Sequence, residues 1–436
     1  MDHLLMARSQ MAFSLAFHII FAAISMVMPF LMYAAYRRYL KHRDPIDLQL
    51  TKAWMKGSAI IFATGAVSGT ALSFQLGLLW PGFMEHAGPI FGMPFSLEGA
   101  AFFLEAIFMG LFMYGWGRIP ERRHLFFGLM MGVCGLMSGL LVIAANGWMN
   151  APTGFDWVNG QAENIHPWKA MFNRAWPLQA LHMLGAAFQA VSIAALGVHC
   201  LGLLRGTGRA FHLRACSYLM PCLVVSSFYM PFTGDLSAKS VAKRQPEKLA
   251  AMEAHFETAT RVPLIIGGIP NEETQEVKYA IKIPGGLSFL AFGNFNAEVK
   301  GLNAFPEGDR PPVLVPHIAF QLMVGIGMLL LTVSLVWLYS KWKKRNLFEC
   351  KWWQRLLLCL APLGFVALES GWIVTEVGRQ PWVIYRIMRT ADSVTAVPGL
   401  GWNFIVIFGL YGVLGFLSFG LLWKWFQIES AREEEV

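Results

Sequence analysis

Several residues that bind metals or protons lie inside long apolar stretches of this chain, where lipid or a protein core would surround them. An ionised side chain at the centre of a bilayer costs at least about 2.5–3.5 kcal/mol, so each residue needs a partner, a cavity or an uncharged form. The set consists of His18, Glu98, Glu105, His182, Met323, Glu369 and Glu376. Imidazole and thioether groups suit the binding of a metal-containing group, and carboxylates suit proton transfer.

Histidine and methionine are axial ligands of haem iron, and a His/Met pair gives a six-coordinate iron suited to electron transfer. His182 and Met323 can make such a site. Oxygen chemistry needs an iron with an open position, for which a single ligand such as His18 or Glu376 is suitable. Carboxylate ligation is unusual, so residue chemistry alone leaves Glu376 the weakest candidate. The alternative is that the histidines are hydrogen-bonded packing residues and that Met323 fills core space.

Glu98 and Glu105 are seven residues apart, which is two helical turns, and so share one helix face. Two acids on one face are typical of a proton relay or of a site beside haem propionates. Ser138 and Asn146 on the next apolar run can extend this polar stripe. The alternative is a protonated pair that hydrogen-bonds to neighbouring helices, with small polar residues that only pack. Glu369 has the same alternative.

The composition indicates a membrane protein. Hydrophobic residues make up 56% of the 436 residues and charged residues 14%, against roughly 25% charged in an average soluble domain. The six cysteines form no CxxC or CxxCH motif, so zinc fingers, iron–sulfur ligation and covalent c-type haem have no support. The net charge of +8 is not organised as a basic, aromatic-rich surface, and we expect no nucleic-acid partner.

We predict an all-α, polytopic membrane protein with nine transmembrane helices. The apolar runs long enough to cross a hydrocarbon layer of about 30 Å lie at residues 12–36, 54–79, 94–115, 125–146, 176–203, 213–233, 314–339, 354–375 and 401–425. The connections after the first, third, fifth and seventh runs carry far more Lys and Arg than the others, which predicts the amino terminus outside and the carboxyl terminus inside. The first run is not expected to be a cleavable signal peptide, because its positive cluster follows the apolar stretch.

The runs divide the chain into three parts: helices one to six within residues 1–233, an outer polar loop at 234–313, and helices seven to nine with an inner tail at 314–436. With 1.5 Å of rise per residue, His18 and His182 lie about 9 Å, Glu98 about 6 Å and Met323 about 13 Å below the predicted outer helix ends. The candidate chemistry is therefore concentrated in the outer half of the membrane.

The outer loop is too long to be a simple connection. From Pro246, apolar residues recur at helical spacing, which predicts a short helix whose polar positions include Lys248 and Glu253. These polar residues can form a solvated helix face at the membrane surface. They can also bind a quinol, with a carboxylate or histidine as base and Lys248 orienting an oxygen.

At these residues the sequence resembles subunit I of the cytochrome bd quinol oxidases, over nearly the whole chain. The resemblance rests on RSQMAFSLAFH (8–18), SLEGAAFFLEAIFMGLFMYGW (96–116), AANGWM (144–149), QALH (179–182), KLAAMEAHFET (248–258), ESGWIVTEVGRQPW (369–382) and GLYG (409–412). GRQPW beside an intramembrane Glu is the most specific of these motifs.

The resemblance implies a bacterial inner-membrane enzyme that oxidises quinol outside, reduces O2 to water and builds a proton gradient without pumping. It implies three haems: one low-spin b haem on His182 and Met323, and two high-spin haems, b and d or both b, on His18 and Glu376. Glu98 and Glu105 would deliver protons and serve the haem cluster.

By the same resemblance, Trp372 and Arg379 would line the haems, and Lys248 with Glu253 would bind quinol. The implied partners are a second multi-span subunit, with room for a small single-span one, and membrane lipid.

Three features depart from the family pattern. Gln321 stands two positions before Met323, where many relatives carry Arg, which removes a positive charge near the low-spin haem. The acids Glu98 and Glu105 are one residue closer than in several relatives. The outer loop lacks a long insertion, which is similar to the short-loop, cyanide-insensitive oxidases.

Two other protein classes are compatible with buried acids and histidines. In an ion-coupled secondary transporter the acids would bind ions, but repeated halves and helices broken at mid-membrane, which are typical of transporters, are not evident in the sequence. A b-haem quinone protein that relays electrons without reducing O2 would favour two-ligand irons, which the pairing of His18 with Glu376 argues against.

Overall fold

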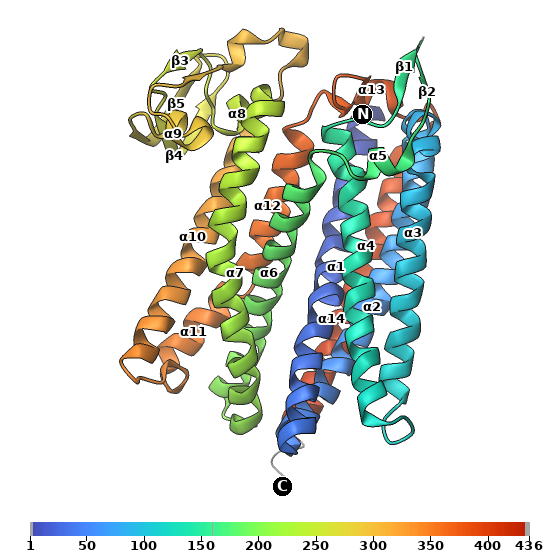
Figure 1. Cartoon of the computed structure of the whole chain (residues 1–436), viewed down its shortest axis with the longest axis vertical. Coiled ribbons are helices and arrows are strands. Elements are labelled where there is room, and N and C mark those ends of the chain that lie inside the picture. Colours follow the sequence, from blue (N-terminus) through green and yellow to red (C-terminus); the bar gives the residue numbers. More distant parts are fainter. Residues whose placement is uncertain (1–2, 159, 432–436) are drawn as a thin grey trace.

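The computed structural model describes residues 3–158 and 160–431. Within this part of the chain, nine helical segments are long and apolar enough to cross a membrane (Figure 1). They are His3–His42, Pro45–Leu79, Pro81–Tyr114, Glu121–Asn150, Trp176–Arg205, Arg209–Arg244, Leu314–Trp342, Lys351–Val377 and Leu400–Gln427. The prediction of an all-α fold with nine spans is confirmed.

Several helices extend beyond the predicted apolar runs. Helix α1 (His3–His42) begins well before residue 12, and α3 (Pro81–Tyr114) begins well before residue 94. Helix α2 (Pro45–Leu79) begins at a proline in the first turn, where Asp44 accepts a hydrogen bond from the Ile46 N–H. Helix α7 (Arg209–Arg244) continues to Arg244. The polar loop therefore starts at Gln245 and not at Gly234.

Helices α1 to α4 form a first four-helix bundle, in which α1 packs on α2 and α4 (Glu121–Asn150), and α3 packs on α4 and α2. Small residues let the helices approach closely: a Cβ on Gly128 of α4 would lie 2.8 Å from the ring of Phe112. Helix α14 (Leu400–Ala431) packs against α1 and α2.

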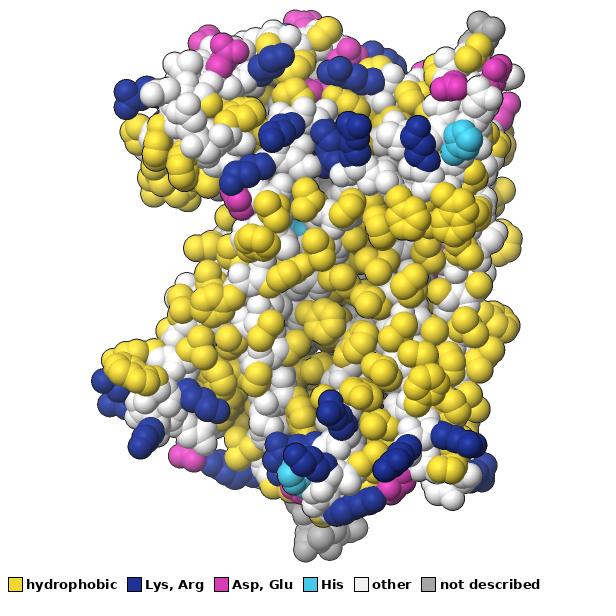
Figure 2. Space-filling model, in the orientation of Figure 1, with side chains coloured by type: hydrophobic (Ala, Val, Ile, Leu, Met, Phe, Trp, Pro, Cys, Tyr) yellow, Lys and Arg dark blue, Asp and Glu magenta, His cyan; other side chains and the backbone are white. Residues whose placement is uncertain are grey.

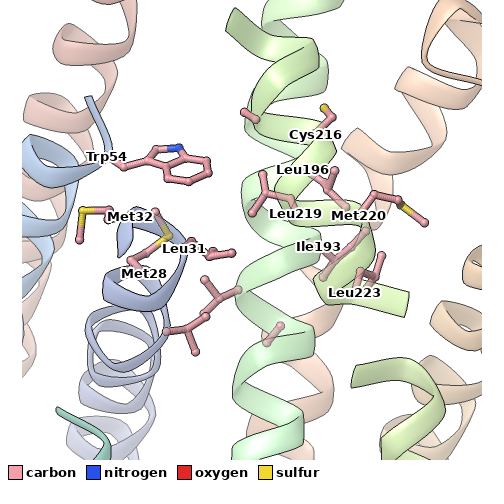
Figure 3. Packing of buried hydrophobic residues seen from close by; sticks show 14 of the residues in the cluster. Met28, Leu31, Met32, Trp54, Ile193, Leu196, Cys216, Leu219, Met220 and Leu223 are labelled. Carbon is pink, nitrogen blue, oxygen red and sulfur yellow. The ribbon is translucent and has the colours of Figure 1, made fainter. Parts of the chain in front are cut away.

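A second bundle consists of α6 (Trp176–Arg205), α7, α10 (Leu314–Trp342) and α12 (Leu363–Val377). In this ring α6 contacts α7, α7 contacts α10, α10 contacts α12 and α12 contacts α6, so α6 and α10 stand on a diagonal. A buried hydrophobic cluster continues from the first bundle into the second. Its members include Met28, Leu31 and Met32 of α1 and Ile193, Leu196, Leu219 and Leu223 of α6 and α7 (Figure 3).

The eighth span is interrupted, although one continuous helix over residues 354–375 was predicted. Helix α11 (Lys351–Leu360) ends before Pro362, and α12 begins at Leu363. Proline lacks the N–H that the helix would use and clashes with the preceding turn, which accounts for the break. A broken span, which the sequence did not reveal, is thus present in the structure.

Residues 245–313, named here the loop segment, lie at one end of the bundles, named here the loop end (Figure 1). The predicted short helix is present as α8 (Pro246–Met252), but it ends before Glu253, which was expected on its polar face. The strands were not predicted. Strand β4 (Leu264–Asn271) pairs antiparallel with β5 (Glu276–Ile283), and β3 (Ala259–Thr260) pairs with β6 (Glu298–Val299). The remaining elements are α9 (Gly286–Phe292) and the 3-10 turns η1 (Leu302–Ala304) and η2 (Glu307–Asp309).

Other short elements connect the spans. They are the antiparallel pair β1 (Asp156–Val158) and β2 (Gln161–Glu163), α5 (Pro167–Met171), the antiparallel pair β7 (Trp382–Ile384) and β8 (Met388–Arg389), α13 (Thr390–Ser393), and the 3-10 turn η3 (Leu347–Glu349). The β7–β8 pair joins the first bundle, because the Tyr385 N–H donates to the Met149 carbonyl.

The start of α1 lies at the loop end and the end of α14 at the opposite end (Figure 1). Between the two polar ends, Figure 2 shows a broad band of hydrophobic side chains. At the end opposite the loop segment, the charged side chains visible in this view are mostly Lys and Arg. The hydrophobic band has the character of a lipid-facing surface.

Candidate functional site

His182 and Met323 occupy the two diagonal helices of the second bundle. On α6, His182 Nδ1 lies 3.2 Å from Thr233 Oγ1 of α7. On α10, Met323 faces α12, since a Cβ on Gly371 would lie 3.2 Å from its sulfur. His182 therefore contacts α7 and Met323 contacts α12, two neighbouring helices of the same ring.

His18 lies in the first bundle, separate from that pair. Its Nδ1 is 2.9 Å from Ser68 Oγ of α2, and Ser68 in turn donates to the Gly65 carbonyl. A Cβ on Gly69 would lie only 2.8 Å from the His18 ring. A partner on one ring nitrogen fixes an imidazole and leaves the other for a metal, which is the usual second-sphere arrangement.

Glu376 ends α12 at the loop end and connects the two bundles. One carboxylate oxygen accepts a hydrogen bond from the Asn146 amide of α4. The other lies 2.5 Å from the Arg379 guanidinium, whose side chain is almost fully buried. Arg379 also donates to the Trp382 carbonyl, while its second terminal nitrogen has no partner among the described residues.

Lys248 of α8 connects the loop segment to the same place. Its ammonium donates to Asn150 Oδ1 at 2.6 Å and to the Thr375 carbonyl at 3.3 Å. The Asn150 amide donates back along α4 to Asn146. A continuous hydrogen-bonded chain therefore runs from Lys248 through Asn150 and Asn146 to Glu376.

The two quinol-loop candidates are both buried and both have shifted pKa values. Burial, with a smaller contribution from the positive charge of Arg379, lowers the pKa of Lys248 to about 7. Burial raises the pKa of Glu253 to about 8, and its Oε2 has no partner within the described chain. No direct hydrogen bond between these two side chains is recorded in the described structure. Near neutral pH both groups can therefore exist uncharged.

The span-three acids face α4. Ser138 Oγ donates to Glu98 Oε1 at 2.9 Å, a contact that fits both the polar stripe and the alternative of an acid hydrogen-bonded to a neighbouring helix. Glu105 is 3% exposed, lies against Gly135, and has an Oε1 without a partner in residues 3–158 and 160–431. Ser138 is twelve residues before the end of α4, or about 18 Å. The predicted depth of about 6 Å for Glu98 was therefore too shallow.

Two further predicted residues of α12 lie in different settings. Trp372 is partly buried against the large hydrophobic cluster. Glu369 has a buried Oε1 that lacks a partner in the described part of the chain.

Gln321 of α10, the departure from the family pattern, binds the loop segment: its side chain accepts from the Gly267 N–H and donates to the Ile265 carbonyl. Its side chain is therefore engaged with β4 and not with the α12 helix that Met323 contacts.

Sequence reasoning missed four residues that hold the loop segment in place. They are Asn150, Glu247, His317 and Tyr385. Tyr385 donates to Glu247 at 2.5 Å, and His317 lies between the carbonyl oxygens of Met252 and Gly267. Asn150 follows Asn146 by one helical turn, a spacing that was available in the sequence. The other three depend on contacts between distant segments.

The residues also fit the binding of planar haem groups. Imidazole, thioether and carboxylate donors are offered from facing helices, and glycines stand beside them at Gly69, Gly371 and Gly234. The last lies beside His182, where a Cβ would be 3.6 Å from the ring. Such glycines leave space that larger side chains would fill.

Comparisons with known proteins identify the family of this chain. The family model for cytochrome bd terminal oxidase subunit I matches residues 6–429. A relative from Bacillus subtilis (strain 168), provisionally named a cytochrome bd menaquinol oxidase subunit I, is 34% identical over 439 residues, covering 100% of this chain and 99% of the relative. Cytochrome bd-II ubiquinol oxidase subunit 1 of Escherichia coli (strain K12) is 28% identical over 505 residues, covering 99% and 98%.

A solved structure is also similar. The bd oxidase from Geobacillus thermodenitrificans matches with a TM-score of 0.92 and 36% sequence identity, covering 98% of each chain. Likeness at this level extends over all nine spans and the loop segment. This chain belongs to the cytochrome bd terminal oxidase subunit I family.

Proposed function

We propose that this chain is the haem-bearing subunit of a bacterial inner-membrane quinol oxidase, which oxidises quinol at the loop end and reduces O2 to water. The observation that carries the proposal is the hydrogen-bonded chain from Lys248 through Asn150 and Asn146 to Glu376. It joins a buried lysine of the loop segment to a carboxylate suited to hold iron. The names of the relatives, which include menaquinol and ubiquinol oxidases, support quinol as the substrate class.

Three haems are proposed: a low-spin b haem on His182 and Met323, and two high-spin haems, b and d or both b, on His18 and Glu376. When bound, haem supplies one-electron transfer and the site of O2 reduction. The protein's part is to orient the ligands: Ser68 and Thr233 hold the Nδ1 atoms of His18 and His182. Arg379 holds one oxygen of Glu376, and Asn146 holds the other.

Quinol would bind beside α8. Oxidation of a quinol releases protons, for which Glu253 is the proposed base, and Lys248 would orient a quinol oxygen. A carboxyl with a pKa of about 8 is well matched to a base that works near neutral pH.

The loop end is proposed to be the outer side, because the connections at the opposite end carry most of the Lys and Arg. Protons released by quinol then leave outside, while Glu98 and Glu105 hold protons that come from inside. The resulting separation builds a proton gradient without pumping. A second multi-span subunit, and in some assemblies a small single-span one, would complete the complex and the inner half of the proton route.

Oxygen uptake by the purified complex with a short-chain quinol tests the activity. The account expects uptake that depends on quinol and a carbon monoxide shift in the reduced spectrum. A protein that only relays electrons between quinones would have haem bands without that shift, and an ion-coupled transporter would have no haem bands.

A further inference from the structure

The β4–β5 hairpin of the loop segment has one face made of exposed apolar residues. Side chains alternate along a strand, and antiparallel partners share a face. The register pairs Ile266 with Ile281 and Leu264 with Ile283, so these four residues lie on the same side. Ile266, Ile281 and Ile283 are 47%, 67% and 44% exposed. The opposite side carries Lys282, and Lys278 follows beyond Tyr279, whose left-handed backbone (φ 58°) interrupts the alternation.

Helix α9 follows the hairpin and adds to this surface. Leu287 and Ala291 are buried, while Phe289, Leu290 and Phe292 are exposed. The ring of Phe289 stacks on the exposed Phe295 at 4.6 Å between centroids. Contiguous exposed apolar surface on a folded protein usually marks a site that contacts another protein or a membrane.

Hydrogen bonds to α10 fix the depth of the hairpin. His317 and Gln321 follow Leu314, the first residue of α10, by three and seven residues, or about 5 and 10 Å along the helix. Both bind β4: His317 contacts the Gly267 carbonyl, and Gln321 binds the Gly267 N–H and the Ile265 carbonyl. Strand β4 therefore lies beside the first turns of a membrane-crossing helix. The edge of β4 that is not paired with β5 is hydrogen-bonded to that helix.

The surface continues onto the lipid-facing side of the bundle. Next to the hairpin, α10 exposes Leu314, Ile318 and Leu322. Figure 2 shows hydrophobic side chains on the lower left side of the overhanging outer part, facing the apolar flank of the bundle. The lysines on the other hairpin face can extend to phosphate groups while their stems cover apolar surface.

We propose that this face, made of Ile266, Ile281 and Ile283 with the exposed side of α9, is immersed in the lipid leaflet at the loop end. The outer edge of β5 leaves backbone groups that hydrocarbon does not tolerate. We therefore expect the hairpin face to enter the leaflet only as far as the lipid headgroups and the upper part of the acyl chains, the depth at which interfacial segments lie. The surface does not depend on the assignment of quinol or of any haem ligand.

Photocrosslinking in the intact complex tests this proposal. Benzoylphenylalanine is placed at Ile281 on the face, at Glu273 in the exposed β4–β5 turn, and at Met328 on the exposed side of α10. The complexes are illuminated in vesicles of phosphatidylethanolamine and phosphatidylglycerol, and adducts are identified by mass spectrometry.

The proposal expects phospholipid adducts at 281 and 328 and few or none at 273. It is overturned if the label at 281 joins a polypeptide, which would assign the face to a second subunit or a second copy. It is also overturned if the label at position 281 gives no phospholipid adduct, or a yield of adduct no higher than that of the label at position 273. Because the readout is an adduct and not activity, failure of the proposed function leaves the result interpretable.

Discussion

Lys248 and Glu376 lie in different segments, yet two asparagines of α4 join them by hydrogen bonds. Lys248 and Asn150 are 98 residues apart in sequence, and Asn146 and Glu376 are 230 apart. A change at Lys248 in the loop segment can therefore affect the carboxylate at the end of α12 without a direct hydrogen bond to it. The side chains of Asn150 and Asn146 each contact both of their neighbours in this series of hydrogen bonds.

Asn150→Ala removes one of the two oxygen acceptors of the buried Lys248 ammonium, and the Thr375 carbonyl remains. Losing a hydrogen bond to a buried charged donor costs about 1–3 kcal/mol, so kcat/KM for quinol should fall roughly fivefold to 150-fold. Oxygen uptake measures the loss. Asn303→Ala, which removes an exposed hydrogen bond to Gln275, is the matched control and should behave as the wild type. Wild-type kcat/KM in Asn150→Ala would refute a role for the link.

The pH dependence of quinol oxidation should follow Glu253. Its pKa is raised to about 8, so the carboxyl is protonated below that pH and cannot accept a proton. For a base, kcat/KM should therefore rise as pH increases through about 8 and level off above it. Glu253→Gln should lower the rate and abolish the rise, whereas Glu257→Gln, at an exposed position in the same segment, should keep it. An unchanged profile in Glu253→Gln would exclude it as the base.

His317→Leu should loosen the loop segment from α10. The ring lies between the carbonyl oxygens of Met252 and Gly267, and its removal leaves the carbonyl that accepts the ring N–H without that donor, at a cost of about 1–3 kcal/mol. Hydrogen exchange of residues 264–283 should become faster. His166→Leu, at an exposed histidine before α5, serves as the control. Equal exchange in both variants would mean that His317 does not hold the loop segment.

Gly69→Ala tests the site around His18. The added methyl would lie 2.8 Å from the His18 ring, so the ring must shift. The carbon monoxide difference spectrum should change while the low-spin signal is retained, because His182 and Met323 lie in the other bundle. Gly77→Ala on the same helix adds a methyl with nothing within 4 Å and is the control. Matching spectra for the two variants would remove His18 from the ligand set.

The number and order of the spans could be predicted because the thickness of the bilayer sets how many consecutive apolar residues a span needs. The ends could not, because polar residues also continue a helix when tertiary contacts support them. Helix α7 runs from the apolar residues before Thr233 on to Arg244, through residues that read as a loop. The break at Pro362 was hidden by the unbroken hydropathy of residues 354–375.

The residue types of the candidate site could be predicted from the sequence, but the hydrogen bonds that join these residues could not. His18, His182 and Glu376 stood out because ionisable side chains are costly in lipid, and Met323 because its thioether can bind haem iron. The link from Lys248 to Asn150, the pairing of Tyr385 with Glu247, and the attachment of β4 to Gln321 join segments that are far apart in sequence. Periodicity within one segment carries no information about such partners.

The reduced-minus-oxidised spectrum of the purified complex, recorded for Met323→Leu beside Met328→Leu, tests the central claim most directly. Both residues are on α10, but Met323 faces Gly371 of α12 and Met328 is exposed on the helix surface. The account predicts three haem signals in the wild type and in Met328→Leu, and a perturbed low-spin signal with the other two retained in Met323→Leu. A colourless complex, or three unchanged signals in Met323→Leu, would contradict it.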